Sequence, residues 1–137
     1  MSRSAADRIA VAVIGAGFIA DYHINGLRAA GGADIAVLAG RRAEATEAKA
    51  AALGIGRAET DYRRVLDDGA IDAVVIATPD DTHERIAIDA LGAGKRVLLQ
   101  KPMALSSEQC RAILAADERA GRHLTVRFMH RCFPVVR

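Results

Sequence analysis

The feature that constrains this chain most is a short apolar run that ends at glycine and passes directly into a helical pattern. Residues Ile9–Ile14 are all apolar, which is typical of a strand buried on both faces of a parallel sheet. In residues 17–30, apolar side chains recur on one helical face until Gly31 and Gly32 interrupt the pattern. A buried strand joined directly to an amphipathic helix is the first part of a strand–helix–strand unit.

The same alternation continues along the chain. Further strands are predicted at 35–39, 56–59, 71–77, 96–99 and 123–129. Further helices are predicted at 43–53, at 61–67, from 81 or 82 to 91, and from 106 or 107 to 120, with Asp81 or Thr82 and Ser106 or Ser107 as the N-caps of the last two. Short joints between such elements favour parallel strands covered by helices on both sides. The expected fold class is therefore α/β, a doubly wound, mostly parallel sheet in three layers of the Rossmann type.

Composition and charge exclude several classes of protein. The chain has 137 residues, of which 51% are hydrophobic and 26% charged, as expected for one globular domain. A net charge of +2 without long runs of like charge argues against nucleic-acid and membrane-surface partners. No stretch reaches the roughly 20 apolar residues that a membrane span needs.

Targeting and redox signals favour a cytoplasmic protein. Arg3 and Arg8 precede an apolar run as in a signal peptide, but the glycines inside that run favour a folded strand and turn. Cys110 and Cys132 show neither the spacing of a zinc site nor that of a disulfide framework. We therefore expect a reduced, cytoplasmic chain without a bound metal.

The glycine turn carries a chemical expectation of its own. The segment Gly15-Ala16-Gly17-Phe18-Ile19-Ala20 fits the pattern G-x-G-x-x-G/A between a strand and a helix. In this pattern Gly15 permits the tight turn, Gly17 lets a pyrophosphate approach the backbone, and Ala20 lets the helix pack closely. The helix N-terminus offers unpaired N–H groups to the phosphates. The turn predicts dinucleotide binding; the alternative is a glycine turn with a purely structural role.

The acid that commonly follows the second strand of such a fold is missing. An Asp or Glu about 20 residues after the glycines usually binds the ribose 2′-hydroxyl. This chain has Gly40-Arg41-Arg42 at that place, and arginine binds a 2′-phosphate through charge-assisted hydrogen bonds. The sequence therefore favours NADP over NAD as cofactor. The alternative is that Arg41 and Arg42 are solvated loop residues.

Three motif blocks extend the pattern beyond the glycine turn. Residues 15–27 read GxGxxAxxH with a later Leu, residues 77–83 read A-T-P-x-x-x-H, and residues 93–102 read A-G-K-x-V-x-x-Q-K-P. Together they resemble the oxidoreductase family named after glucose-fructose oxidoreductase, inositol dehydrogenase and rhizopine catabolism. Residues 126–134 loosely resemble the closing strand of that family and put Arg131 at its Arg position.

The resemblance implies hydride transfer between a nicotinamide dinucleotide and a small-molecule substrate of the sugar or polyol class. It implies Lys101 as the catalytic residue, which exchanges a proton with the reacting oxygen or polarises it. The alternative for Lys101 is an ordinary lysine at a strand end. The predicted cofactor-binding residues are Gly15, Gly17, Phe18, Ile19, Gly40, Arg41, Arg42, Thr78, Pro79, His83, Gln100, Lys101 and Arg131.

The sequence leaves open the roles of two histidines in these blocks, His23 and His83. His23 occupies a buried helix face near the glycine turn, where a structural role is favoured over a cofactor contact. His83 has either a role at the start of a helix or a place in the wall beside the nicotinamide. Gln100 departs from the family, which has Glu there, so Lys101 lacks a neighbouring carboxylate.

The family also has a second, substrate-holding domain, for which this sequence has no counterpart. Residues 8–130 are expected to form the cofactor domain, residues 1–7 a flexible N-terminus, and residues 131–137 the start of the crossing to that domain. Apolar side chains such as Phe133, Val135 and Val136 then predict self-association. We expect no turnover by this chain alone. A non-catalytic nucleotide-binding module, as a truncated product or a sensor, is the alternative to an enzyme.

Overall fold

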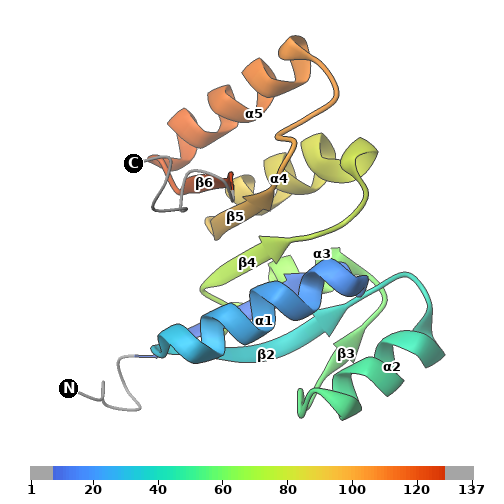
Figure 1. Cartoon of the computed structure of the whole chain (residues 1–137). Helices are drawn as coiled ribbons and strands as arrows, with labels where there is room; N and C mark the ends of the chain where they lie inside the picture. Colours follow the sequence, from blue (N-terminus) through green and yellow to red (C-terminus); the bar gives the residue numbers. More distant parts are fainter. Residues whose placement is uncertain (1–7, 129–137) are drawn as a thin grey trace, which may run out of the picture.

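The computed structural model describes residues 8–128, which form a six-stranded sheet with helices on both faces (Figure 1). The predicted segments 1–7 and 131–137 lie outside the described residues. Within residues 8–128, no helix has both the length and the apolar character that a bilayer crossing requires. The strands are β1 (Ile9–Ile14), β2 (Ala33–Ala39), β3 (Ala58–Glu59), β4 (Ala73–Ile76), β5 (Arg96–Gln100) and β6 (Leu124–Arg127). The helices are α1 (Phe18–Ala30), α2 (Ala43–Ala52), α3 (Tyr62–Asp67), the 3₁₀ turn η2 (Asp80–Thr82), α4 (His83–Gly92) and α5 (Ser107–Ala120).

The order of the strands reverses beside β1. All strand pairs in the described chain are parallel, and the order across the sheet is β3-β2-β1-β4-β5-β6. The chain thus runs from β1 to β2 and β3 on one side of β1, and then returns to β4, β5 and β6 on the other side. A reversal of this kind opens a crevice at the carboxyl ends of the strands. The predicted α/β, doubly wound, parallel architecture is confirmed.

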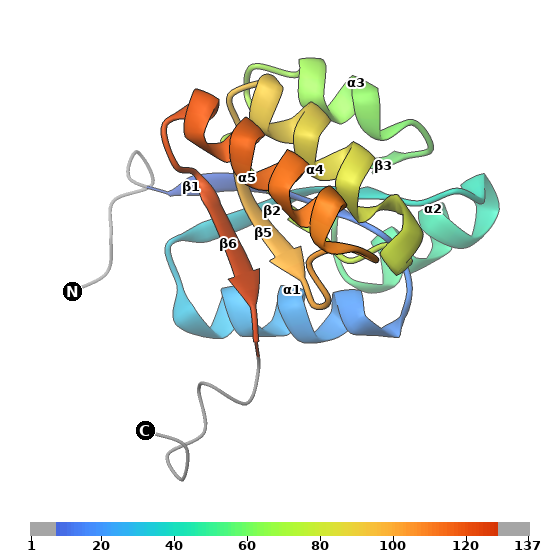
Figure 2. The ribbon, with the colours of Figure 1, turned by 90° about the horizontal axis from the view of Figure 1, so that it is seen from above.

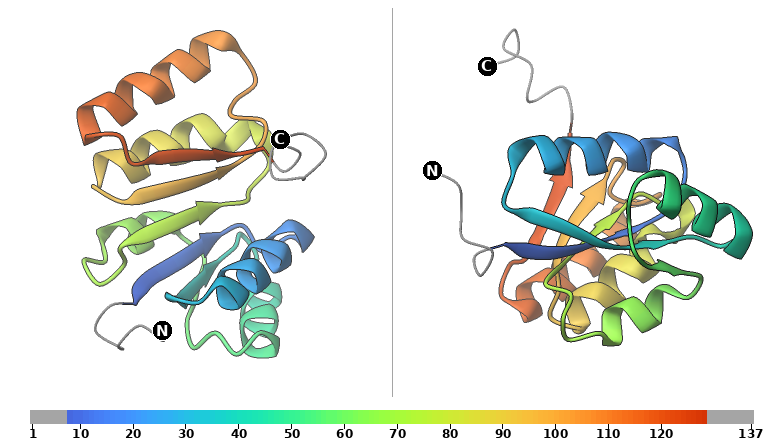
Figure 3. Two further views of the ribbon diagram at one scale, coloured as in Figure 1. Left: turned by 60° about the vertical axis from the view of Figure 1, so that its left-hand side comes forward. Right: turned by 90° about the horizontal axis from the view of Figure 1, so that it is seen from below.

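Alternate side chains of β1 pack into two separate cores. Ala12 and Ile14 belong to the core beneath α3, α4 and α5, whereas Val11 and Val13 belong to the core beneath α1 and α2. Figures 2 and 3 show these two groups of helices on opposite faces of the sheet. Ala20 of α1 is completely buried, so this helix lies directly against the strands. The residues of β1 are apolar throughout because both of its faces are covered.

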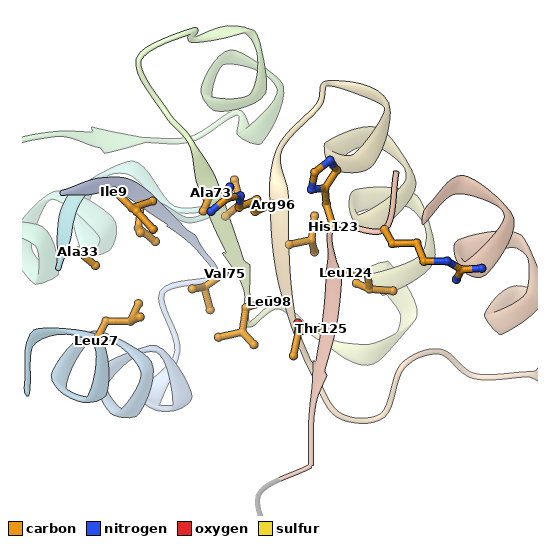
Figure 4. Close-up of a pocket in the computed structure, with 14 residues that line it drawn as sticks. Ile9, Leu27, Ala33, Ala73, Val75, Arg96, Leu98, His123, Leu124 and Thr125 are labelled. Carbon is orange, nitrogen blue, oxygen red and sulfur yellow. The ribbon is translucent and has the colours of Figure 1, made fainter. Parts of the chain in front are cut away.

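One half of the sheet face that carries α1 has no helix over it in the described chain. The connections of β4, β5 and β6 run through α4 and α5, which lie on the other face (Figure 3). An apolar groove of about 530 Å³ lies on this half of the sheet face, between α1 and β6 (Figure 4). Its lining includes Leu27 of α1, Val75 of β4, Leu98 of β5 and Thr125 of β6.

Some element ends differ from those predicted. β2 begins at Ala33 rather than at residue 35, because Ala33 and Asp34 pair with the first residues of β1. β4 and β6 are shorter than predicted. Ser106 caps α5 as expected, since its Oγ accepts a hydrogen bond from Gln109 N at 3.2 Å. Thr82, one of the two predicted N-caps of α4, is the N-cap residue of that helix, but its side chain makes no capping bond: its hydroxyl lies 2.7 Å from the Pro79 carbonyl within the turn η2.

Candidate cofactor site at the carboxyl edge of the sheet

The register of the sheet brings the predicted site segments to one edge. Ile14 at the end of β1 is level with Ala39 of β2 and with Ile76 of β4. Ile76 is in turn level with Leu99 of β5. The segments that leave these strands therefore start side by side, at Gly15, Gly40, Ala77 and Gln100.

Gly15 has a conformation and surroundings that only glycine tolerates. Its φ is +111°, and a Cβ atom at this position would overlap the backbone carbonyl of Ala77. Its N–H donates a hydrogen bond to the carbonyl of Ala39 at 2.8 Å. The turn is thereby fixed between the ends of β2 and β4, as the glycine pattern predicts for its first position.

Gly17 is a glycine for a different reason. It is the N-cap residue of α1, has an ordinary φ of −75°, and makes no side-chain capping bond. A Cβ atom here would find no heavy atom within 4 Å, so the backbone faces open space. Phe18 at the start of α1 is 75% exposed and packs edge to face with Tyr22, whereas Ile19 is half-buried. The backbone at the start of α1 is thus open on the Gly17 side, as an anion site at a helix N-terminus requires.

The segment after β2 lies against the glycine turn. A Cβ atom at Gly40 would overlap the side chains of Thr46 and Ala16, so glycine permits this close approach. Arg41 and Arg42 follow it and are exposed. Among residues 8–128, neither guanidinium group has an ion pair or a side-chain hydrogen bond. Both arginines are therefore exposed and unpaired among the described residues.

A buried histidine contacts the backbone of the segment that follows β4. Thr78 is half-buried and Pro79 is exposed at the start of η2. His83, the first residue of α4, is 0% exposed. Its Nε2 lies 3.0 Å from the Thr78 carbonyl and its Nδ1 lies 2.8 Å from the Pro102 carbonyl. His83 thus joins the two segments that leave β4 and β5 instead of facing the open side of the site.

Lys101 leaves the end of β5 with an exposed side chain. Its neighbours on both sides are held by histidines. His83 contacts the carbonyl of Pro102, and the ring Nε2 of His23 lies 3.0 Å from Oε1 of Gln100. Both imidazole rings are buried, so the side chain of Gln100 is tied to α1 and the backbone of Pro102 is tied to α4.

His23 is a buried polar residue of α1, 3% exposed. Burial lowers the pKa of its imidazole, the hydrogen bond to Gln100 opposes this effect, and the charge of Arg127 lowers the pKa further. The ring is therefore neutral near pH 7 and donates its Nε2–H to the Gln100 oxygen. A glutamate at position 100, as in the resembling family, would place a negative charge at this contact.

Sequence reasoning missed one cation at the site. Lys49 of α2 reaches the glycine turn, where its Nζ lies 2.8 Å from the Gly17 carbonyl and 3.2 Å from Oδ2 of Asp21. The sequence gives no local signal for this contact, because Lys49 lies 32 residues from Gly17. Arg131 lies outside the described residues. Among residues 8–128, no group of three or more His, Cys, Asp or Glu residues is placed to hold a metal ion.

Comparisons with known proteins give the family and the fold of this chain. Residues 9–128 match the oxidoreductase family with an NAD-binding Rossmann fold. Inositol 2-dehydrogenase 2 of Saccharopolyspora erythraea is 41% identical over 127 residues, which are 90% of this chain and 37% of the relative.

Two solved structures share the fold closely. An NAD-binding oxidoreductase from Klebsiella pneumoniae superposes with a TM-score of 0.89 at 30% identity, covering 94% of this chain and 36% of that protein. The WlbA dehydrogenase from Bordetella pertussis, in complex with NADH and UDP-GlcNAcA, gives a TM-score of 0.88 at 31% identity, covering 94% of this chain and 39% of that protein. The chain thus spans little more than a third of the length of these relatives. It belongs to the oxidoreductase family with an NAD-binding Rossmann fold that includes the inositol dehydrogenases.

Proposed function

We propose that this chain is the cofactor domain of an oxidoreductase that transfers hydride between NADP(H) and a sugar, polyol or related alcohol or carbonyl compound. The observation that carries the proposal is the row of segments at the carboxyl edge. The open backbone at Gly17 and the exposed Lys101 lie along the same edge of one sheet. When bound, the nicotinamide supplies the hydride chemistry.

The residues present fit such a cofactor. The space beside Gly17 admits a pyrophosphate, which the N–H groups at the start of α1 would bind. Thr78 and Pro79 follow β4 at the same edge, next to the segment that carries Lys101. Lys101 would hold or release the proton of the reacting oxygen, while His23 holds the side chain of Gln100 and His83 holds the backbone of Pro102 on either side of it. The substrate class rests on the names of the relatives, among them an inositol 2-dehydrogenase.

The choice between NADP and NAD depends on Arg41 and Arg42. No acidic residue follows β2 directly, and Arg41 and Arg42 are exposed in the segment after Gly40, which lies close to Ala16 of the glycine turn. A charge-assisted hydrogen bond from either arginine would favour a 2′-phosphate. The relative from Bordetella pertussis binds NADH, so NAD is the alternative cofactor.

The test is a fluorescence titration of the chain with NADPH and with NADH. We expect tighter binding of NADPH, and Arg41→Ala should reduce that preference by about tenfold, the effect of one charge-assisted hydrogen bond of roughly 1.5 kcal/mol. Arg28→Ala, at the far end of α1, is the control and should leave the preference unchanged. Equal affinities for the two cofactors in the unsubstituted chain would refute the NADP preference.

A binding module without catalysis is the second candidate. It is favoured by Gln100, which removes the carboxylate that the resembling family has next to its lysine. Binding without turnover in a protein that also contains a substrate domain would select this candidate.

Self-association of the chain is part of the proposal. The apolar groove on the open half of the α1 face supports it, because exposed apolar patches favour association. The residues named for this role from the sequence, Phe133, Val135 and Val136, lie outside the described residues. A cytoplasmic location is proposed on cysteine usage and on the glycines inside the apolar run near the N-terminus, and Cys110 is unpaired within residues 8–128.

A further inference from the structure

The contact between Lys49 and the glycine turn joins two segments that are distant in the sequence. Lys49 lies near the end of α2, and its ammonium group approaches both the carbonyl of Gly17 and the carboxylate of Asp21. Its side chain is 22% exposed and that of Asp21 is 40% exposed, so the ion pair is partly shielded from water. The ammonium group thus lies within the first turn of α1, where the cofactor phosphates are expected.

Asp21 alone would oppose anion binding at this helix end. A carboxylate in the first turn of a helix is favourable for the helix itself, because it interacts with the positive end of the dipole. The same negative charge repels a second anion that binds the N–H groups of that turn. Lys49 offsets the charge of Asp21 and leaves the positive helix end available to a pyrophosphate.

Lys49 also connects the two parts of the expected site. α2 begins directly after Arg41 and Arg42, and Lys49 fastens this helix to the turn that holds Gly17. The spacing between the arginines and the glycine turn is therefore fixed in part by one side chain.

We propose that Lys49 is a positioning residue for the dinucleotide, which acts through Gly17 and Asp21 and raises the affinity for the cofactor phosphates. The proposal rests on the cofactor site proposed above. It is not a catalytic role, because Lys49 lies on α2, away from the segment that carries Lys101.

The chain offers a matched control. Arg28 also links α1 to the α2 segment, since its Nη2 donates a hydrogen bond to the carbonyl of Leu53 at 2.6 Å. This contact lies at the C-terminal end of α1, far from the glycine turn. A substitution at Arg28 therefore weakens the same helix pair without changing the charge beside the expected phosphates.

The experiment compares NADPH affinity, by fluorescence titration, for Lys49→Met, Lys49→Arg, Arg28→Met and the double variant Asp21→Asn with Lys49→Met. At low salt, Lys49→Met should weaken binding by about three- to tenfold, as expected for an ion pair near a helix end. Lys49→Arg and Arg28→Met should bind like the unsubstituted chain. The double variant should regain most of the lost affinity, and the defect of Lys49→Met should shrink at about 1 M salt because of screening.

Two outcomes of this titration would contradict the proposed role of Lys49. Unchanged affinity in Lys49→Met, or an equal loss in Arg28→Met, would show that Lys49 has only a structural role. Urea unfolding of each variant identifies any loss of the fold itself. No binding of NADPH or NADH by the unsubstituted chain would contradict the proposed function, and the role of Lys49 with it.

Discussion

Gly15 and Gly17 belong to one motif, but glycine is needed at the two positions for different physical reasons. Gly15 has a positive φ and no room for a side chain beside Ala77, whereas Gly17 has an ordinary φ and open space around it. The first glycine therefore serves the fold, and the second leaves a surface for a ligand. The sequence pattern assigns the tight turn to Gly15 and the open backbone to Gly17, and the structure adds the positive φ and the overlap with Ala77 that require glycine at the first position.

Substitution of the two glycines should separate stability from binding. Gly15→Ala should lower the free energy of unfolding by about 2 kcal/mol or more, because it combines a strained φ with an overlap. Gly17→Val should keep the circular dichroism spectrum and most of the stability but lose dinucleotide affinity. Urea unfolding and cofactor titration of both variants check this. A folded Gly17→Val chain that binds the cofactor normally would mean that the turn is merely structural.

The buried His23 makes a prediction about pH. In the unfolded chain its imidazole gains a proton near the ordinary pKa of about 6.5, whereas the folded chain does so only at lower pH. The unfolded state therefore binds more protons below about pH 6.5, so this residue lowers stability as the pH falls through that value towards the folded pKa. Above it, the contribution of neutral His23 is fully present.

Gln100→Glu should raise the lowered pKa of the His23 ring. A carboxylate at the Nε2 contact would favour the protonated ring and raise the pKa of His23. NMR titration of the His23 ring protons measures the change directly, with the exposed His123 as reference in the same spectra. An unchanged pKa of His23 in this variant would show that its ring does not respond to residue 100.

At the scale of elements, the sequence predicts most of the fold but not all of its ends. Continuous apolar runs such as β1 are recognisable because both faces of the sheet are covered. Ser106 caps α5 because its backbone is extended, with φ −145° and ψ 159°. Thr82 has φ −98° and ψ −10°, so its hydroxyl cannot reach forward into α4. Local composition does not distinguish these two backbones.

Contacts between elements are the part of the site that the sequence does not reveal. The motif blocks give Lys101 and Gly17, but the histidine contacts around Lys101 join residues far apart in the chain. His23 and Gln100 are separated by 77 residues, and His83 and Pro102 by 19. A single sequence carries no signal for such pairings, because each partner also fits an ordinary local role.

At the scale of the molecule, residues 8–128 place the expected cofactor site and an apolar groove in different parts of the sheet. The carboxyl edge carries the expected cofactor site, while the apolar groove lies on the open half of the α1 face. The chain also spans only 37% of the inositol dehydrogenase that it matches. If the chain acts as the proposed cofactor domain, residues 1–137 should bind a dinucleotide, associate with themselves through the apolar groove and not complete a reaction.

Turnover and mass test this expectation together. Hydride transfer requires the substrate carbon to be held against the nicotinamide, and such positioning is worth roughly 7–11 kcal/mol of the barrier. We therefore expect no reduction of NADP with a panel of polyols and aldoses, and a mass above that of the monomer by light scattering. Steady turnover by a clean monomer would mean that residues 1–137 suffice as an enzyme.

The central claim, that the glycine turn binds a nicotinamide dinucleotide, is tested most directly by NMR mapping of NADPH on the uniformly ¹⁵N-labelled chain. We predict that backbone amide signals of residues 17–20 and 40–42 shift as NADPH is added, with a saturating dependence on its concentration. Amides that line the apolar groove, such as those of Leu98 and Thr125, should stay unchanged. Shifts confined to the groove, or no shifts at the glycine turn at saturating NADPH and NADH, would contradict the account.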